Sequence, residues 1–397
     1  MADSSDSLWS SIVHVPSTAG DKAVHHISWA LPFGATASVY AFNRLARGLW
    51  KCMTMKLSCI LTQFYDDFPQ LEPTQTGPSA RSSVTSFLDI LGIGWSSGPK
   101  DLEFAKVFQP LGVRFDLTKM SRLAEFEVSN KPSRIEAMVL DIDQVKASGK
   151  LPPAHASEMH GRLHFTESQT FGKAALPAIR EIGHRSHEHG KPTALHAKLR
   201  FALDFLRSHL LTAIPRIIRA CDPSRNLLVF SDGSYENLRG EWGFVICDTA
   251  DGTIEVSGAQ VPKELVDHWT RTVGDQIITQ IELLGVFVAR LFLEKRTASR
   301  KVIYWIDSDA ARDSLIRGYS TSEASLSIIY QFYKFERSGP SNLWFARVPS
   351  HSNIADEPSR GAAKNVVKQF GAREVFSTIP REIIRELVDF SSLHRKL

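Results

Sequence analysis

Cysteine is scarce in this chain of 397 residues, which has only Cys52, Cys59, Cys221 and Cys247 and no CxxC pair. Scattered cysteines of this kind exclude a disulfide framework or a cysteine-based zinc site and indicate reduced thiols. No run approaches the roughly 20 apolar residues that a membrane-spanning helix needs. The start, MADSSDSLWSSIV, lacks a basic segment followed by an apolar one, so no secretory signal is expected. We therefore expect an intracellular protein, of the cytoplasm or nucleus, that is neither secreted nor in a membrane.

A large excess of one charge is also missing. The chain has 47 Lys and Arg against 43 Asp and Glu, and its 43% of hydrophobic residues is typical of a soluble globular protein. Its length predicts two or three domains. The charge is unevenly spread, because residues 131–225 hold 15 basic against 9 acidic residues and 8 of the 14 histidines. This segment favours a surface that faces a polyanion, although a solvated helical face would explain it as well.

The pattern of the chain changes along its length, and no internal repeat is present. The polar stretch EPTQTGPSARSS, residues 72–83, predicts a loop or hinge. Residues 104–130 predict a hairpin-like pair of strands, and helical periodicity dominates residues 132–218. From residue 226 onward, strands alternate with helices.

Residues 226–365 predict a mixed α/β domain, in which helices pack against a five-stranded sheet. Three antiparallel strands come first, and TADGT between the second and third is a hairpin signal. Helices and two further strands follow. The five predicted strands are residues 227–231, 241–248, 253–261, 301–307 and 342–348. Trp242 and Trp344, on the second and fifth strands, are expected in or near the core, with base stacking as the less favoured alternative.

Two of the predicted strands end in an acid, although each strand is apolar enough to be buried. Asp232 follows LLVFS, and Asp307 follows VIYWI. Burying an unpaired carboxylate costs several kcal/mol, so these positions need an explanation. A chain reversal at Asp232–Ser234 would explain the first acid equally well. The ends of neighbouring central strands open into one crevice in α/β sheets, so we expect both acids to lie there together.

Glu282 and Asp356 are the other acids in unusual places. On the helix predicted for residues 275–296, Glu282 shares a stripe with small and apolar residues. Gly285 lowers helix stability, and we expect it to let this helix approach the sheet closely. Asp356 opens the last helix just after the fifth strand, where the helix dipole alone would also favour an acid.

Four converging carboxylates repel one another unless cations neutralise them. Mg²⁺ suits such a site, because it binds a few carboxylates and keeps water and phosphate oxygens as further ligands. We therefore expect Asp232, Glu282, Asp307 and Asp356 to hold two Mg²⁺ ions, with Mn²⁺ as a substitute. Two ions about 4 Å apart can activate water on one side of a phosphodiester and stabilise the leaving oxygen on the other. His351 could shuttle a proton to the leaving group or relay product release, although most histidines in surface loops are inert.

These acids lie in the segments SDGS, QIELL, WIDSDA and NIADEPSR. Their order and elements resemble the Asp-Glu-Asp-Asp set of type 1 ribonuclease H. NIADEPSR is similar to the closing motif of ribonuclease H domains in gypsy-like and DIRS-like retroelements. The resemblance implies Mg²⁺-dependent endonucleolytic hydrolysis of the RNA strand of RNA–DNA hybrids, with the four acids as catalytic metal ligands. His351 precedes Asp356 by only five positions, which departs from the longer loop of the cellular enzymes.

The first part of the chain carries a second set of motifs. FYDDFP places Asp66 and Asp67 among aromatics, which fits either a tight hairpin with a metal at its tip or a polar turn. LPFGATASVYAFNRLARGLW, with Phe33 and Gly34, resembles the motif LPFGxxxxPxxFxR of reverse transcriptases. Tyr65 with the two acids is similar to their YxDD hairpin. The resemblance implies a polymerase palm, in which the Pro-Phe-Gly turn and the following helix line the nucleotide and template pocket.

The polymerase resemblance is incomplete at the start. A polymerase needs a third acid upstream of the LPFG segment, but only 30 residues precede Leu31, and Asp3 or Asp6 is the nearest substitute. These residues do not contain a fingers region. The chain therefore resembles an N-terminally truncated reverse transcriptase–ribonuclease H polyprotein of a retroelement. We expect little or no RNA-directed DNA synthesis unless a partner polymerase subunit supplies the fingers.

Four regions are predicted on this basis. They are a partial palm at 1–95, a basic thumb or connection at 96–225, a ribonuclease H domain at 226–365 and a helical tail at 366–397. The alternative from another class is a catalytically decayed protein that binds hybrids or single strands without turnover.

The basic region carries the residues that we expect to contact a nucleic-acid backbone. They are Lys191, Lys198, Arg200 and Arg207. The neighbouring histidines His184, His187 and His189 favour a solvated basic loop over a zinc site, because a zinc site needs rigid ligands and a fourth donor.

Overall fold

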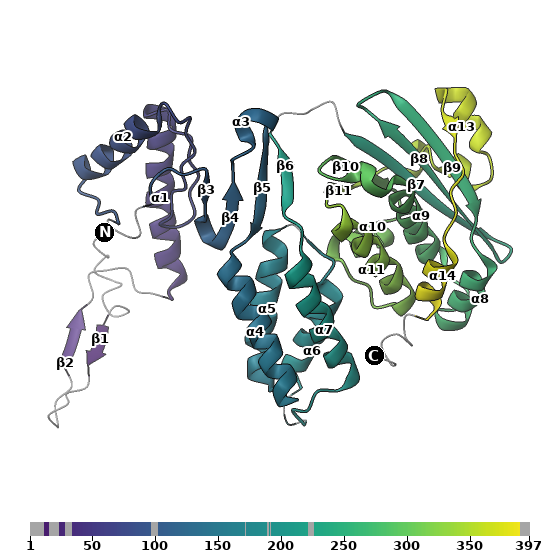
Figure 1. Ribbon diagram of the computed structural model, residues 1–397, viewed down its shortest axis with the longest axis horizontal. Helices are drawn as coiled ribbons and strands as arrows, with labels where there is room; N and C mark the ends of the chain where they lie inside the picture. The colour runs from purple at the N-terminus through teal and green to yellow at the C-terminus, as the bar shows by residue number, and fades with distance from the viewer. Residues whose placement is uncertain are drawn as a thin grey trace. The chain divides into compact units, whose positions relative to one another are not determined.

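The computed structural model describes residues 12–15, 24–27, 34–96, 102–170, 172–188, 190, 192–220 and 226–389. The chain divides into two compact units, Met1–Ala105 and Lys106–Leu397 (Figure 1). The predicted roles of Phe33, Lys191 and His189 fall outside the described residues, as does a substitute third acid at Asp3 or Asp6. None of the helices in the described ranges is both long and apolar enough to cross a membrane.

The first unit contains two long helices and a pair of short strands. β1 (Ile12–Val15) pairs antiparallel with β2 (Val24–Ile27), and the helices are α1 (Thr36–Lys56) and α2 (Gly77–Ile90). Gly34 precedes α1 with a φ of 87°, in the left-handed region that glycine adopts without strain. The helix predicted after the LPFG segment is therefore present.

The start of α2 shows that the loop predicted for residues 72–83 was wrong from residue 77 onward, whereas residues 72–76 form no helix or strand. α2 begins at Gly77, and Pro78 lies in its first turn. Proline suits that place, because the first N–H groups of a helix have no partner within the helix. The hydroxyls of this polar helix are satisfied locally, as where Ser83 Oγ donates to the Ser79 carbonyl at 2.9 Å. A serine-rich segment can therefore form an exposed helix here.

The second unit begins with a four-stranded antiparallel sheet in the order β3-β4-β5-β6. Four helices lie between β5 and β6 in the chain and bury one apolar cluster, which includes Ile142, Leu163 and Leu203. The hairpin predicted for residues 104–130 and the helices after it are confirmed. The elements are β3 (Val107–Phe108), β4 (Val113–Asp116), α3 (Met120–Leu123), β5 (Glu125–Asn130), α4 (Pro132–Ser148), α5 (Pro153–Gln169), α6 (Leu176–Ser186), α7 (Ala197–Thr212) and β6 (Arg216–Arg219).

The helical region ends earlier than predicted. α7 stops at Thr212, and Arg216–Arg219 form β6, which pairs antiparallel with β5. Pro215 lacks the N–H that a continuing helix needs. The β-branched Ile217 and Ile218 favour an extended strand, so tertiary pairing with β5 decides the outcome.

The rest of the second unit is built on a six-stranded mixed sheet in the order β11-β10-β7-β8-β9-β12 (Figure 1). β7, β8 and β9 are antiparallel neighbours, whereas β10 runs parallel to both β7 and β11. The predicted mixed α/β fold and its five strands are present. The sheet has a sixth strand that the sequence did not reveal, because it is only two residues long. The strands are β7 (Leu227–Glu236), β8 (Arg239–Asp248), β9 (Thr253–Gln260), β10 (Lys301–Ile306), β11 (Asn342–Arg347) and β12 (Arg373–Glu374).

The central strand β7 continues well beyond the predicted end at Ser231. It pairs with β8 through Asp232, which lies opposite Gly243, and on to Glu236. The chain reverses at Asn237 and Leu238, whose φ values of 50° and 62° suit a tight two-residue hairpin turn. The alternative of a chain reversal at Asp232–Ser234 is therefore wrong, and Asp232 belongs to the strand itself.

Helices cover both faces of this sheet. The largest core of the molecule joins inward residues of β7, β8 and β10 to the helices of one face, and α13 packs over Val245 and Val256 on the other. Ile383 and Leu387 of α14 belong to the large core, so part of the predicted helical tail is integral to the packing. The helices are α8 (Lys263–Thr272), α9 (Ile278–Leu293), α10 (Asp309–Arg317), α11 (Glu323–Ser338), α12 (Asp356–Ser359), α13 (Ala363–Phe370) and α14 (Arg381–Val388).

The two tryptophans predicted for the core have different environments. Trp242 is 1% exposed and belongs to the large core, as predicted. Trp344 is 68% exposed, so the prediction that it lies in or near the core was wrong. It lies on β11, the edge strand, where the side chains of Leu343 and Phe345 point into the core and that of Trp344 alternates to the other face.

Two glycines let α9 lie directly on β7. A Cβ atom on Gly285 would lie 2.9 Å from the Asp232 carbonyl oxygen, and one on Gly233 would lie 2.8 Å from the Glu282 nitrogen. Both distances are shorter than side chains tolerate, so neither position can carry a larger residue without moving the backbone. The expected role of Gly285 in close packing is confirmed.

We predict that Gly285→Ala destabilises the protein, although alanine favours helices by about 1 kcal/mol. The clash with the Asp232 carbonyl should outweigh that gain and leave a net loss of about 1–3 kcal/mol in the free energy of unfolding. Chemical denaturation of both proteins measures it.

Gly161 provides a matched control, because it lies within α5 and a Cβ there would meet nothing within 4 Å. Gly161→Ala should be stabilising. If Gly285→Ala were stabilising as well, the close approach of α9 to β7 would be contradicted.

Candidate metal centre

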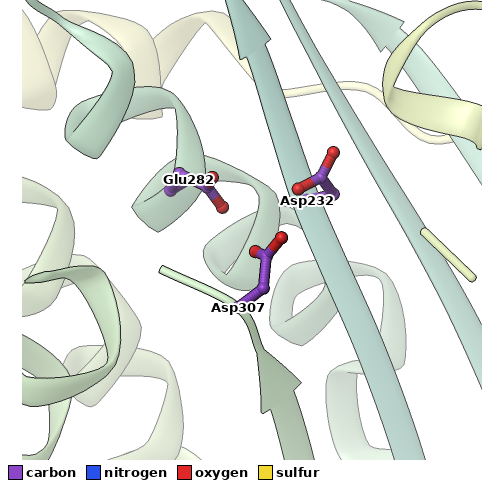
Figure 2. Close-up of side chains that lie close together, drawn as sticks. All are labelled: Asp232, Glu282 and Asp307. Carbon is purple, nitrogen blue, oxygen red and sulfur yellow. The ribbon is translucent and has the colours of Figure 1, made fainter. Parts of the chain in front are cut away.

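Three carboxylates converge at the centre of the six-stranded sheet. Asp232 lies within β7, Glu282 lies near the start of α9, and Asp307 directly follows β10. One oxygen from each of them lies within 4.8 Å of the others, and Figure 2 shows the three side chains pointing toward one another. Three of the four acids singled out in the sequence are thus brought together.

The convergence follows from strand register and from helix packing. β10 pairs parallel with β7, and Ile306 lies opposite Ser231, so Asp307 comes next to Asp232 at the following position. The close contact of α9 with β7 at Gly233 and Gly285 then places Glu282 over the same point. The backbone holds all three acids together, and no side-chain rearrangement is needed to assemble them.

Burial makes the charges of this cluster costly. Asp232 is 4% exposed and Glu282 is 7% exposed. Burial, with smaller contributions from the charges of Asp232 and Asp307, raises the pKa of Glu282 to about 9. Burial also raises the pKa of Asp232 to about 6, with contributions from Asp307 and Asp356, although a hydrogen bond from Ser359 opposes the shift. The cluster thus favours a bound proton or a bound cation over three free charges.

The cluster fits a hard divalent cation. Glu282 Oε2 and Asp307 Oδ1 are buried and have no hydrogen-bond partner among the described residues. Buried polar atoms are normally paired, so unpaired carboxylate oxygens on two of the three clustered acids fit the binding of a cation. Oxygen-only ligands are those that Mg²⁺ and Mn²⁺ prefer.

Asp356 lies beside the cluster but outside it. The group of closely spaced ligand atoms found in the described residues contains the other three acids and not Asp356. Its side chain is 47% exposed and accepts a hydrogen bond from Arg360 Nε at 3.0 Å. Its charge nevertheless contributes to the raised pKa of Asp232.

Two polar residues near the site were missed in the sequence. Asn353 is 4% exposed, and its Nδ2 donates to the Ser231 carbonyl at 3.1 Å. Ser359 is fully buried, and its Oγ lies 2.5 Å from Asp232 Oδ2. Both flank Asp356 in the segment NIADEPSR, so a small polar residue on either side of a candidate ligand was the available signal.

His351 lies in a short 3₁₀ turn, Ser350–Ser352, between β11 and α12. Its side chain is exposed. An exposed position just before α12 suits a residue that exchanges protons with solvent. The proton-transfer role of His351 stays a prediction.

The predicted hairpin around Asp66 and Asp67 is present in the first unit. Phe64 and Asp67 exchange two backbone hydrogen bonds of 2.9 Å, and Tyr65 at the tip has a φ of 53°. Both acids are exposed. Within the part of the chain that the structure describes, no third metal-ligating side chain joins them. The polymerase roles of Tyr65, the two acids and Gly34 stay predictions.

The basic residues predicted to contact nucleic acid differ in their surroundings. Lys198 and Arg200 are exposed on α7. Arg207 is already paired, because its Nε and Nη2 donate to the Asp143 carboxylate at 2.7 and 3.1 Å. Arg207 is therefore a weaker candidate than the other two. His184 lies in the last turn of α6 and not in the predicted loop, and its Nδ1 is 3.8 Å from Glu181. No metal cluster in the described residues includes it.

Neither protein-family models nor curated proteins match this chain. Among solved structures, it is similar to ribonuclease H1 of the halophilic archaeon Halobacterium salinarum NRC-1, with 17% identity, a TM-score of 0.28, and 35% of this chain and 98% of that one covered. LC11-RNase H1, isolated from compost by a metagenomic approach, gives 17% identity, a TM-score of 0.29 and coverage of 36% and 99%. A foamy viral protease-reverse transcriptase in complex with double-stranded DNA gives 14% identity and a TM-score of 0.44, with 87% of this chain and 54% of that one covered.

Proposed function

We propose that residues 226–389 form a metal-dependent nuclease of the ribonuclease H type, which hydrolyses the RNA strand of RNA–DNA hybrids. The observation that carries the proposal is the cluster of Asp232, Glu282 and Asp307, in which two buried carboxylate oxygens have no partner among the described residues. The order of the acids along the chain and the segment NIADEPSR support the substrate class.

Asp232, Glu282 and Asp307 would hold the metal, which we propose to be Mg²⁺ or Mn²⁺. Bound there, divalent ions would lower the pKa of a water molecule and offset the charge that develops on a phosphodiester oxygen. The predicted pair of ions also requires Asp356. Because Arg360 engages that carboxylate, Asp356 would join the site by giving up an ion pair that is exposed and therefore weak.

The protein residues have separate tasks in this proposal. Asp232 and Asp307 are fixed on adjacent strands and set the position of the scissile phosphate, while Glu282 closes the site from the helix side. His351, in its exposed turn, would give a proton to the leaving oxygen or relay the product to solvent. Selection of hybrids would come from contacts to 2′-hydroxyls across a shallow minor groove, without reading of the base sequence.

The proposal extends to the first unit and to the basic helices, which would act in nucleic-acid binding and DNA synthesis. The chain would be part of an intracellular retroelement polyprotein, with a partial polymerase palm in the first unit and a nucleic-acid-binding surface at Lys198 and Arg200. DNA synthesis would need a partner subunit that supplies the fingers. The exposed acids at the tip of the Phe64–Asp67 hairpin support this second activity.

We predict that the purified chain cleaves the RNA strand of a labelled hybrid duplex when Mg²⁺ is present and not when it is chelated. Asp232→Asn should reduce cleavage by about 10³-fold or more, because it removes a charged ligand from the middle of the cluster. Asp356→Asn should have a smaller effect, since that residue lies outside the cluster. Gel analysis of the products measures both.

Asp267→Asn is the matched control, because Asp267 is an exposed acid on α8, away from the cluster. It should cleave like the unaltered chain. Binding of the hybrid that weakens with salt, without cleavage in Mg²⁺ or Mn²⁺, would instead favour a decayed nucleic-acid-binding protein.

We predict that Glu282→Gln raises the thermal stability of the metal-free protein at about pH 8. The pKa of Glu282 is raised from 4.5 to about 9, so the folded protein holds this proton more tightly than the unfolded chain does. The corresponding stability is fully present below pH 4.5 and is lost as the pH rises through 9. The neutral amide avoids that loss and should gain at least about 1 kcal/mol.

Calorimetry in the presence of a chelator measures this difference across the pH range. The gain from Glu282→Gln should shrink toward pH 5, because near pH 4.5 the unfolded chain also holds this proton and ionisation no longer favours unfolding. Glu264→Gln, at an exposed position of α8, should show no comparable pH dependence. Equal melting temperatures for Glu282→Gln and the unaltered chain at pH 8 would contradict the raised pKa.

A further inference from the structure

The segment Asn353–Arg360 is attached to β7 at successive positions along the strand. Asn353 Nδ2 donates to the Ser231 carbonyl, and Ser359 Oγ donates to the Asp232 carboxylate. Further along, Ser234 Oγ donates to the Ser359 carbonyl at 2.6 Å, and Arg360 Nη1 donates to Glu236 at 3.3 Å. α12, which lies inside this segment, is therefore fixed relative to the strand that carries Asp232.

Two glycines on the neighbouring strands fix the height of α12 above the sheet. A Cβ atom on Gly243 of β8 would lie 2.4 Å from the Ser359 nitrogen. One on Gly258 of β9 would lie 2.2 Å from the Pro358 carbonyl oxygen. The backbone at Pro358 and Ser359 thus rests directly on the sheet, and the Ser359 hydroxyl has little freedom to move away from Asp232.

The hydroxyl of Ser359 is suited to hold a carboxylate that must also bind a cation. Ser359 is fully buried, and its Oγ lies 2.5 Å from Asp232 Oδ2. A hydroxyl is neutral, so it can restrain the carboxylate without competing electrostatically with a metal ion. The contrast with Asp356 is direct, because Arg360 holds that acid with a full positive charge.

We propose that Ser359 is a positioning residue for the metal site, whose hydroxyl fixes the Asp232 carboxylate in the orientation that faces Glu282 and Asp307. This inference rests on the proposed metal-dependent function. Without the hydroxyl, repulsion from Asp307 and Asp356 would turn the Asp232 side chain away from the cluster. The metal would then have to restore the orientation on binding, and its affinity would fall.

The experiment measures Mn²⁺ binding to the full chain in the absence of nucleic acid, by the electron paramagnetic resonance signal of free Mn²⁺. Ser359→Ala should raise the dissociation constant by about 10-fold or more, the usual effect of removing a group that orients a metal ligand. Cleavage by this variant should recover at high Mn²⁺, because the catalytic groups are unchanged. Ser359→Cys, which fills the same space with a poorer donor, should have an intermediate dissociation constant.

Ser234→Ala is the matched control, because it also removes a hydroxyl that joins β7 to α12 but leaves the Asp232 carboxylate untouched. It should lower the melting temperature without changing Mn²⁺ affinity. The proposal is overturned if Ser359→Ala and Ser359→Cys bind Mn²⁺ as the unaltered chain does, or if Ser234→Ala weakens binding equally. If the unaltered chain itself fails to bind Mn²⁺ or to cleave, the proposed function is overturned instead.

Discussion

The candidate metal centre is governed by one electrostatic constraint, the repulsion among Asp232, Glu282 and Asp307 in a place that solvent hardly reaches. Such a cluster loses the hydration that normally stabilises each charge, and it gains like-charge repulsion in addition. Burial, together with the charges of Asp232 and Asp307, brings the pKa of Glu282 to a value at which it is protonated in neutral solution. A cation is the natural means by which all three groups could be ionised together.

The backbone keeps the positions that carry the three acids close together, so only rotation of a side chain could relieve this repulsion. Asp232 and Asp307 are at adjacent positions of two hydrogen-bonded strands, and Glu282 is on a helix that glycines hold directly on one of those strands. On the opposite side, α12 rests on Gly243 and Gly258 and brings Ser359 to Asp232. Small residues, which contribute no functional groups themselves, therefore set the geometry of the site.

The acids and the order of the strands could be predicted from short stretches of sequence. The length of a strand, the pairing of an acid and the exposure of a side chain could not, because they depend on residues distant in the chain or in the fold. Asp232 and Asp307 were found because each ends an apolar run, but β7 extends past Asp232 only because β8 continues to pair with it. Asp356 lies outside the cluster, where its carboxylate pairs with Arg360, four residues later in the chain. The exposure of Trp344 depends on β11 lying at one edge of the sheet.

The same distinction applies to the C-terminal end of the proposed nuclease region. The apolar pattern of residues 226–365 contains five strands and suggested a complete domain, yet β12 and α14 come later in the chain. Ile383 and Leu387 are 8% and 1% exposed within the main core. A recombinant fragment that stopped at residue 365 would uncover apolar surface on α8 and α11 and would be prone to aggregate, so the shortest useful fragment has to extend through Val388.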